Sequence, residues 1–383
     1  MVVEGLCTVD FFKKFKKNIK QKQCSKIDAV MLFVFLGLLF IPMSNFSDAD
    51  KSLQENRALA NYKPLWQDGR FNRSYSLDFE KWFNDRFFGR KYLLDIYYKI
   101  KYTLAPLAGN RYVLVGKDGW LFYKMERSLD NFANRLILSP QKMQQNLLYL
   151  KAIDAWCRKN GKEFYYVIVP DKNMIYGEYY RFIKKEHSSN YGVAHQFYNY
   201  IKENSDIKAV YLYDALMENK DKGLLFYKQD THWSHLGAYY GYKSLMKLMD
   251  IPTKSFEFEE KPFEGNLYRM LGSNTIQDNS LYKTLKIKDT SFCKFYEINA
   301  MNNECFNSNG TKNVFMLRDS CGGALLYYLS GHFHKIYTEK NTHVLTPEDL
   351  EKIESDYDIV IFEVVERFIP MMLDEPFYKR FKE

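Results

Sequence analysis

Cysteine is scarce in this sequence and is not arranged as a metal site. The chain has 383 residues and six cysteines, with no Cys-x-x-Cys pair or zinc spacing among them. Cys293 and Cys305 are close enough in sequence to form one disulfide, although free buried thiols fit the spacing equally well. Two histidine pairs lack a carboxylate at familiar ligand spacing: His232 with His235, and His332 with His334. We therefore expect neither a metal nor a cofactor.

A basic stripe of the kind that binds nucleic acid is also missing from the body of the chain. The formal net charge is +8. Residues 1–30 hold seven lysines against three acidic residues, so half of this excess belongs to the N-terminal tail. A nucleic-acid footprint would place a basic cluster on the folded domain, and none follows residue 30. A nucleic-acid partner is therefore not expected.

One long apolar segment is present near the N-terminus. Residues 29–43 read AVMLFVFLGLLFIPM, and extension to 27–46 gives 20 residues, about the length of a bilayer-spanning helix. Lysines crowd its N-terminal side, which by the positive-inside bias stays in the cytoplasm. The alternative is a signal peptide cleaved near Ser47-Asp48-Ala49, but about 28 residues precede the apolar run, more than is usual. We expect an uncleaved, single-pass type II anchor and an extracytoplasmic, periplasmic catalytic part.

Strand-like and helix-like patterns alternate through the rest of the chain. Helical spacing or helix caps mark residues 75–104, 139–160, 191–203 and 234–249, with Ser139 and Ser234 as N-caps. Short apolar runs occupy residues 164–169, 209–213, 224–227, 314–317 and 359–365. This alternation predicts an α/β fold with a mainly parallel sheet and helices on both faces. Residues 253–312 have no clear assignment.

The chain organisation that follows has four segments. We expect a cytoplasmic basic tail, a transmembrane anchor, a helical juxtamembrane region and a catalytic domain, at residues 1–26, 27–46, 47–110 and 111–383 respectively. In open α/β sheets, ligands bind beyond the carboxyl ends of the strands. Polar residues collect at these positions: Asp171-Lys172, Asp214, Asp230 with His232, Asp319-Ser320, and Glu366-Arg367.

Ser320 is the candidate nucleophile. It follows an apolar run directly and precedes a small-residue helix start, Cys321-Gly322-Gly323. Backbone N–H groups at such a helix start can hold the oxyanion of a tetrahedral intermediate, which nominates Cys321 and Gly322 as donors. A serine in this place can also act merely as a helix cap.

Asp230 and His232 are the candidate base system. A serine needs a base to become nucleophilic, and histidine suits this role because its pKa lies near neutrality. A carboxylate two residues earlier in a loop can reach the imidazole and fix its tautomer. Asp-x-His alone is a weak signal, because a buried histidine bonded to its neighbour has the same pattern. Asp171, Lys172 and Arg367 are candidates to line the substrate site, with surface salt bridges as the alternative.

At these elements the sequence resembles the AlgJ/AlgX group of SGNH-hydrolase-like proteins. The resemblance rests on Asp230-Thr-His232-Trp-Ser, followed after about ninety residues by a strand and Arg318-Asp319-Ser320. Further similar stretches are residues 52–57 (SLQENR), 79–86 (FEKWFNDR), 89–90, 116–122 (GKDGWLF), 169–172 (VPDK), 175–176 and 366–367. One departure is Gly265-Asn266-Leu267, where the group often has Gly-Asp-Leu.

The resemblance implies a triad of Asp230, His232 and Ser320 on a circularly permuted, flavodoxin-like SGNH fold. The group is implicated in O-acetylation of alginate and related exported polysaccharides. It also implies an AlgI-type multi-spanning membrane acyltransferase as the partner that supplies acetyl groups. The chain ends 63 residues after Ser320, which favours the membrane-anchored AlgJ form over the AlgX form with its appended carbohydrate-binding domain. Alternatives are an acetyl esterase with the same triad and a non-catalytic polysaccharide-binding scaffold.

Overall fold

The protein consists of two compact units, Met1–Tyr97 and Tyr98–Glu383. The computed structural model describes residues 26–52, 57–67, 69–104, 109–184, 192–271, 278–286, 294–297, 302–340 and 344–373. Cys293 lies outside the described residues. Cys305 is disulfide-bonded, whereas Cys157 and Cys321 are free and buried.

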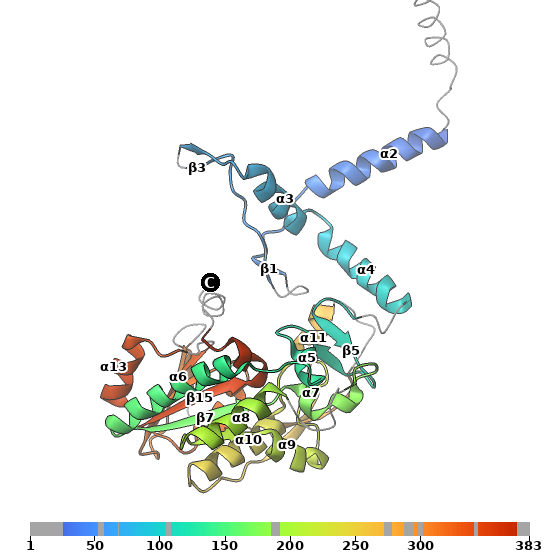
Figure 1. The fold of residues 1–383 in the computed structure, drawn as a ribbon. Helices are drawn as coiled ribbons and strands as arrows, with labels where there is room; N and C mark the ends of the chain where they lie inside the picture. Colours follow the sequence, from blue (N-terminus) through green and yellow to red (C-terminus); the bar gives the residue numbers. More distant parts are fainter. Residues whose placement is uncertain are drawn as a thin grey trace, which may run out of the picture. The chain divides into compact units, whose positions relative to one another are not determined.

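The first unit begins with an apolar helix. α2 spans Lys26–Phe40 and is continued by the 3-10 helix η1, Ile41–Met43 (Figure 1). The segment Lys26–Met43 is 18 residues long, is apolar enough to cross a membrane by composition, and has none of its residues buried. Such a segment is compatible with a membrane anchor or with a signal sequence.

Short ladders and two helices complete the first unit. The ladders pair β1 (Lys51–Ser52) with β2 (Arg57–Ala58), and β3 (Trp66–Gln67) with β4 (Arg70–Phe71). The prediction of one helix over residues 75–104 is wrong, because the structure has two: α3, Tyr75–Arg86, and α4, Arg90–Leu104. Phe87 leaves α3 in an extended conformation, and Gly89 takes a positive φ of 82°, which side chains with a Cβ rarely adopt. Glycine at this position therefore permits the break.

A seven-stranded sheet forms the centre of the second unit, counted over the described residues. Its order is β11-β12-β14-β13-β15-β7-β8. The strands are β7 (Glu163–Val169), β8 (Ala209–Tyr211), β11 (Lys294–Glu297), β12 (Asn302–Phe306), β13 (Asn313–Arg318), β14 (Lys335–Lys340) and β15 (Ile359–Val365). Neighbours from β14 to β8 are parallel, whereas β11 and β12 form an antiparallel edge. Figure 1 shows β7 and β15 side by side in this sheet.

Helices cover the sheet, and their caps agree with the sequence. β15 is buried along its whole length and β7 along all but its first residue, as expected for strands covered on both faces. The longer helices are α6 (Pro140–Lys159), α8 (Val193–Asn204), α10 (His235–Leu248), α12 (Gly322–Leu329) and α13 (Pro347–Asp356). The predicted N-caps are confirmed: the hydroxyl of Ser139 accepts from the N–H of Lys142 at 3.1 Å, and that of Ser234 accepts from the N–H of Gly237 at 3.2 Å.

Smaller elements surround this core. They are β5 (Val113–Val115), β6 (Leu121–Tyr123), α5 (Ser128–Phe132), α7 (Lys172–Ile175), η2 (Gly177–Tyr179), α9 (Tyr213–Glu218), η3 (Lys220–Lys222), β9 (Phe258–Lys261), α11 (Asn266–Leu271), β10 (Tyr282–Leu285) and η4 (Glu366–Met371). The expected strand at residues 224–227 is absent from the sheet: Phe226 forms only an isolated bridge with Trp233. β14 was not foreseen, because Lys335–Lys340 reads KIYTEK and has few apolar residues.

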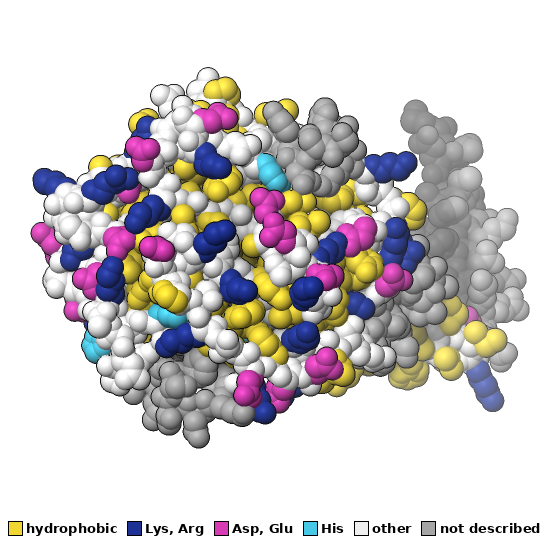
Figure 2. Space-filling view, turned by 90° about the horizontal axis from the view of Figure 1, so that it is seen from below, with side chains coloured by type: hydrophobic (Ala, Val, Ile, Leu, Met, Phe, Trp, Pro, Cys, Tyr) yellow, Lys and Arg dark blue, Asp and Glu magenta, His cyan; other side chains and the backbone are white. Residues whose placement is uncertain are grey.

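The surface does not separate charges by sign on the face shown in Figure 2. Among its described residues, Lys and Arg side chains alternate with Asp and Glu, and apolar side chains lie between them. This pattern is that of an ordinary solvated surface rather than of a basic patch for nucleic acid.

A buried carboxyl group connects three elements at the carboxyl end of the sheet. Glu366 directly follows β15 and is fully buried. Its Oε1 accepts from Nδ2 of Asn131 at 2.9 Å, and its Oε2 accepts from the hydroxyl of Tyr211 at 2.5 Å. Burial, reinforced by the nearby charge of Asp171, raises the pKa of Glu366 to about 8. The folded protein therefore binds this proton more tightly than the unfolded chain.

This pKa predicts a pH-dependent stability. A carboxyl group with a raised pKa stabilises the folded state below its unfolded pKa and loses that contribution as pH rises through about 8. The free energy of unfolding should therefore fall between about pH 5 and pH 8, measured by chemical denaturation. Glu366→Gln should flatten this fall, whereas Glu351→Gln, at an exposed position on α13, should leave it unchanged. An unaltered pH slope in Glu366→Gln would contradict the assignment.

Candidate active site

Three of the predicted site residues follow neighbouring parallel strands. Asp171 lies two residues after β7, Ser320 two residues after β13, and Arg367 two residues after β15. Because these strands are parallel, their carboxyl ends meet at one edge of the sheet, where ligands bind in such folds. Ser320 is partly exposed, whereas Asp171 and Arg367 are buried.

The carboxylate of Asp319 holds the turn that presents Ser320. Its Oδ1 accepts from the N–H of Cys321 at 2.7 Å, and its Oδ2 accepts from the N–H of Val365 at 2.5 Å. The N–H of Asp319 donates to Oε2 of Glu363 at 3.1 Å. The end of β13 is thereby fastened to β15. The role of Asp319 was not predicted beyond its place beside Ser320, and Glu363 was missed because it lies within an apolar strand.

Both predicted oxyanion donors already have carboxylate acceptors in this structure. The N–H of Cys321 donates to Asp319, and the N–H of Gly322 donates to Glu363. A Cβ on Gly322 would lie 2.5 Å from Oε2 of Glu363 and 2.7 Å from Cβ of Arg318, so only glycine fits. An oxyanion at these donors would have to share or displace the carboxylates. Burial raises the pKa of Glu363 well above its usual range.

Cys321 does not compete with Ser320 as a nucleophile. Its thiol is free and almost fully buried. Burial, with the adjacent Asp319, raises the pKa of this thiol well above its ordinary value. Since the thiolate is the reactive form of cysteine, Cys321 is unreactive and serves as packing behind the turn.

Asp230 and His232 form a close pair. Nδ1 of His232 lies 2.5 Å from Oδ1 of Asp230, which also accepts from the N–H of His232 at 2.9 Å. Oδ2 of Asp230 accepts from the N–H of Asn266 at 2.7 Å. Burial alone would raise the pKa of Asp230, but these hydrogen bonds outweigh it and lower the pKa. Asp230 is therefore a carboxylate, Nδ1 of His232 is its donor, and Nε2 remains as the basic nitrogen.

Lys172 supports the loop that carries this pair. Its ammonium group donates to the carbonyl oxygens of Tyr227 at 3.1 Å, Lys228 at 2.9 Å and Asp230 at 2.6 Å. The side chain is buried against the rings of Trp120 and Phe122. Burial lowers the pKa of Lys172 to about 7, opposed by the charge of Asp230. Lys172 thus fixes the shape of the loop rather than standing on the surface.

The segment 265–267 supports the same loop from its other side. A Cβ on Gly265 would lie 1.8 Å from the carbonyl oxygen of Gln229, so glycine is required for the close approach. The N–H of Leu267 donates to that carbonyl at 3.1 Å, while the N–H of Asn266 donates to Asp230. The contact to Asp230 comes from the backbone, so asparagine at position 266 supplies it as well as aspartate would.

Trp233 connects the histidine loop to the serine turn. Its Nε1 donates to the carbonyl oxygen of Cys321 at 3.0 Å. Gly237 and Gly241 on α10 leave room for Trp233, since a Cβ at either glycine would contact its side chain within 3.1 Å. This hydrogen bond therefore joins Trp233, the neighbour of His232, to Cys321, the neighbour of Ser320. Within the described part of the chain, neither Oγ of Ser320 nor Nε2 of His232 has a hydrogen-bond partner, a looseness common in sites without substrate.

A small pocket adjoins the histidine loop. It is lined by Phe122, Tyr123, Ser128, Asp171, Lys172, Asn173, Thr231 and Arg367. Nη1 of Arg367 donates to Oδ1 of Asp171, and both side chains are buried. Burial raises the pKa of Asp171 although Arg367 opposes it. The alternative of a surface salt bridge is therefore wrong for this pair. Oδ2 of Asp171 and Nε of Arg367 are buried and have no hydrogen-bond partner among the described residues.

The candidate site thus combines a serine at the carboxyl end of β13 with a histidine–carboxylate pair whose loop is hydrogen-bonded to the serine turn. In the described ranges, no group of three or more His, Cys, Asp and Glu is placed to hold a metal ion.

Residues 113–304, half of the chain, match the family model described as "SGNH hydrolase-like domain, acetyltransferase AlgX". The chain belongs to this AlgX family, and the resemblance inferred from its motifs is confirmed. The match includes Asp230 and His232; Ser320 lies beyond it.

Named relatives come from several bacteria. The chain is 24% identical over 223 residues to the probable alginate O-acetylase AlgJ of Pseudomonas aeruginosa, covering 56% of this chain and 54% of that protein. It is 26% identical over 180 residues to the probable alginate O-acetylase AlgJ of Pseudomonas putida, covering 44% of each. The chain thus spans about half the length of the curated relatives it matches.

Two solved structures with a similar chain path come from Pseudomonas putida and Bacillus cereus. The O-acetyltransferase domain of Pseudomonas putida AlgJ has a TM-score of 0.45 at 19% identity, covering 71% of this chain and 98% of that chain. Bacillus cereus PatB1 has a TM-score of 0.49 at 16% identity, covering 68% of this chain and 97% of that chain. Family membership and the strand order confirm the predicted SGNH-like α/β fold class.

The support that Lys172 gives to the loop can be tested directly. Lys172→Met keeps the length of the side chain but removes three hydrogen bonds, so the Asp230–His232 pair should lose its fixed position. We expect the rate of Ser320 sulfonylation by a sulfonyl fluoride to fall by about tenfold or more, with the circular dichroism spectrum retained. Lys151→Met, at an exposed position on α6, is the matched control. Equal labelling rates in both variants would show that the loop does not need Lys172.

Proposed function

We propose that this protein is an O-acetyltransferase that acetylates an exported polysaccharide of the alginate type through an acetyl-Ser320 intermediate. The observation that carries the proposal is the fixed Asp230–His232 pair, linked through Trp233 to the turn that presents Ser320. Membership of the AlgX family and the relatives named alginate O-acetylase AlgJ support acetyl transfer as the reaction and a polysaccharide as the acceptor.

The mechanism has two half-reactions that use the same base. Oγ of Ser320 attacks the acetyl carbonyl carbon while Nε2 of His232 takes its proton, and the carboxylate of Asp230 stabilises the imidazolium. The tetrahedral intermediate collapses, and the leaving group departs with the proton from His232. A sugar hydroxyl then gives its proton to Nε2 and attacks acetyl-Ser320. Collapse of this second intermediate releases the acetylated sugar and returns the proton to Ser320.

The pocket beside the histidine loop suits part of a polar acceptor. Asp171, Asn173 and Arg367 each have a buried polar atom without a partner among the described residues. Such atoms are costly when unpaired, and hydroxyl groups of a sugar could satisfy them. We assign Asp171 and Arg367 to the acceptor side of the site, and Lys172 to support of the catalytic loop.

The location of the enzyme follows from the same proposal. Acetyl-CoA is cytoplasmic, so an exported acetyltransferase needs a membrane partner that relays the acetyl group. We propose an AlgI-type multi-spanning acyltransferase as this partner and the segment 27–46 as an uncleaved type II anchor. The exposed apolar helix Lys26–Met43 supports the anchor. The disulfide of Cys305 supports an oxidising compartment outside the cytoplasm.

The triad predicts strong and non-additive losses on substitution. Ser320→Ala and His232→Ala should each lower acetyl transfer to an alginate oligosaccharide by roughly a thousandfold or more, and the double variant should be little worse. Purified full-length protein, assayed with a chromogenic acetyl ester and analysed by mass spectrometry, should carry one acetyl group on Ser320. Near wild-type transfer by Ser320→Ala would exclude the mechanism. Release of acetate at the same rate with and without oligosaccharide would identify an esterase instead.

The anchor predicts the side of the membrane on which the site lies. Alkaline phosphatase, which needs an oxidising compartment, should be active when fused after Glu383. The same fusion without residues 27–46 should be inactive and should fractionate with the cytoplasm. An active phosphatase in the truncated fusion would contradict the role given to this segment, and recovery of the intact fusion in a soluble periplasmic fraction would favour a cleaved signal.

A further inference from the structure

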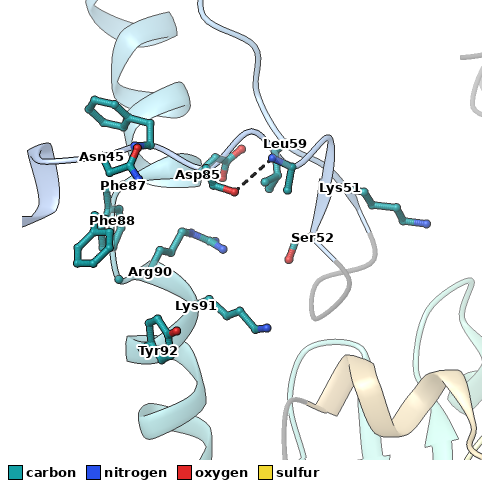
Figure 3. A pocket seen from close by; sticks show the side chains of 14 residues that line it. Asn45, Lys51, Ser52, Leu59, Asp85, Phe87, Phe88, Arg90, Lys91 and Tyr92 are labelled. Atoms are coloured by element: carbon teal, nitrogen blue, oxygen red, sulfur yellow. Dashed lines mark hydrogen bonds between the residues drawn. The ribbon is translucent and has the colours of Figure 1, made fainter.

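A largely apolar pocket lies in the first unit, and none of its lining residues belongs to the candidate active site. Its apolar walls come from Phe46, Leu59, Phe87, Phe88 and Tyr92. The other lining residues are Asn45, Ser47, Ala49, Lys51, Ser52, Asp85, Gly89, Arg90 and Lys91. Figure 3 shows Arg90 and Lys91 extending toward the side on which Ser52 lies. The pocket therefore combines an apolar interior with cationic side chains.

The pocket begins where the apolar helix ends. The N–H of Phe88, in the break between α3 and α4, donates to the carbonyl oxygen of Pro42 in η1 at 3.0 Å. The N–H of Ser47 donates to the carbonyl oxygen of Arg86 at 2.8 Å, and Phe46 forms an isolated β-bridge with Phe87. If the segment 27–46 spans a membrane, these contacts hold the pocket at the membrane surface. Aromatic side chains are enriched at that depth.

The walls of the pocket are fixed by buried charged groups. Arg86 is buried and donates to the carbonyl oxygens of Ala60 at 2.7 Å, Ser47 at 2.8 Å and Ala49 at 3.0 Å. Oδ2 of Asp85 accepts from the N–H of Ala60 at 2.8 Å, as drawn in Figure 3. The pocket is thus a built feature, and the acidic group in its lining is already engaged.

We propose that this pocket binds an anionic phospholipid of the surrounding membrane. An acyl chain would pack against Phe46, Leu59, Phe87 and Phe88, and the headgroup phosphate would lie at Lys51, Arg90 and Lys91. Three cations against one engaged carboxylate favour an anionic headgroup. The inference goes beyond acetyl transfer, and it rests on the proposed membrane anchor.

The exposed side of α4 supports a lipid rather than a soluble anion. Tyr92, Leu93 and Ile96 are each more than half exposed and lie along one side of this helix, at helical spacing, beside the pocket. Their apolar surface would contact the membrane interface while Lys91 reaches phosphate groups. A pocket for free phosphate would need neither the apolar interior nor this helix side.

The test uses the full-length protein in mild detergent and native mass spectrometry. After incubation with phosphatidylglycerol or phosphatidylcholine, the wild type should retain phosphatidylglycerol at least about tenfold better. Lys51→Gln/Lys91→Gln should lower its retention by about tenfold, and Phe88→Ser should lower retention of both lipids. Arg73→Gln, which removes one exposed charge of the same unit outside the pocket, is the control and should behave as wild type. Millimolar inorganic phosphate should not compete.

The outcomes separate this proposal from the proposed reaction. All four proteins should turn over a soluble acetyl ester at similar rates, because the altered residues lie outside the active site. Equal retention of both lipids by wild type and double variant would overturn the proposal, as would competition by inorganic phosphate. If Ser320→Ala loses ester turnover but retains lipid as well as the wild type does, lipid binding and the reaction are independent of each other.

Discussion

The ammonium group of Lys172 holds the loop on which the candidate chemistry depends. The loop 227–232 has no regular secondary structure, and three of its carbonyl oxygens converge on this one side chain. The carbonyl oxygens of Lys228 and Tyr227 also accept from the N–H groups of Leu121 at 2.9 Å and Asp230 at 3.4 Å, so Lys172 adds to the backbone hydrogen bonds that satisfy this loop. With Lys172 in place, the carboxylate of Asp230 points at Nδ1 of His232, and the base is oriented before any substrate arrives.

A second constraint acts on Ser320, the candidate nucleophile. The carboxylate of Asp319 accepts from both the serine turn and the end of β15, so the position of Ser320 is tied to the centre of the sheet. Several acidic groups are buried at this edge, among them Glu363 and Glu366, whose pKa values burial raises. Burying such groups disfavours their charged form, and the hydrogen bonds they accept offset part of that cost. The edge of the sheet is therefore rigid because its carboxyl groups connect strands rather than contact water.

Buried charged groups have a different role in each of the two units. In the first unit, Arg86 and Asp85 fold the chain back onto the end of the apolar helix and form a pocket there. In the second, the same kinds of charged groups are buried at the carboxyl ends of parallel strands. Membrane attachment and acetyl transfer would thus be carried by separate parts of one chain, each with its own buried charged contacts.

Features that depend on neighbours in sequence were predictable from the sequence alone. The apolar segment, the helix caps at Ser139 and Ser234, the buried strands β7, β13 and β15, and the spacing of Asp230 and His232 all reflect local pattern or local hydrogen bonding. The order of motifs also identified the family. The break at residues 87–89 was missed because helical spacing continues across it, and β14 because its residues are mostly polar.

Contacts between distant residues were decided only by the tertiary structure. Lys172 meets carbonyl oxygens 55 to 58 positions away, and Arg367 meets Asp171 across 196 positions, because strand order brings these ends together. The hydrogen bond from the N–H of Gly322 to Glu363 likewise depends on β15 lying beside β13. Sequence determined which residue types could perform the chemistry. The parallel pairing of the strands decided which of them lie at the candidate site and which hold the others in place.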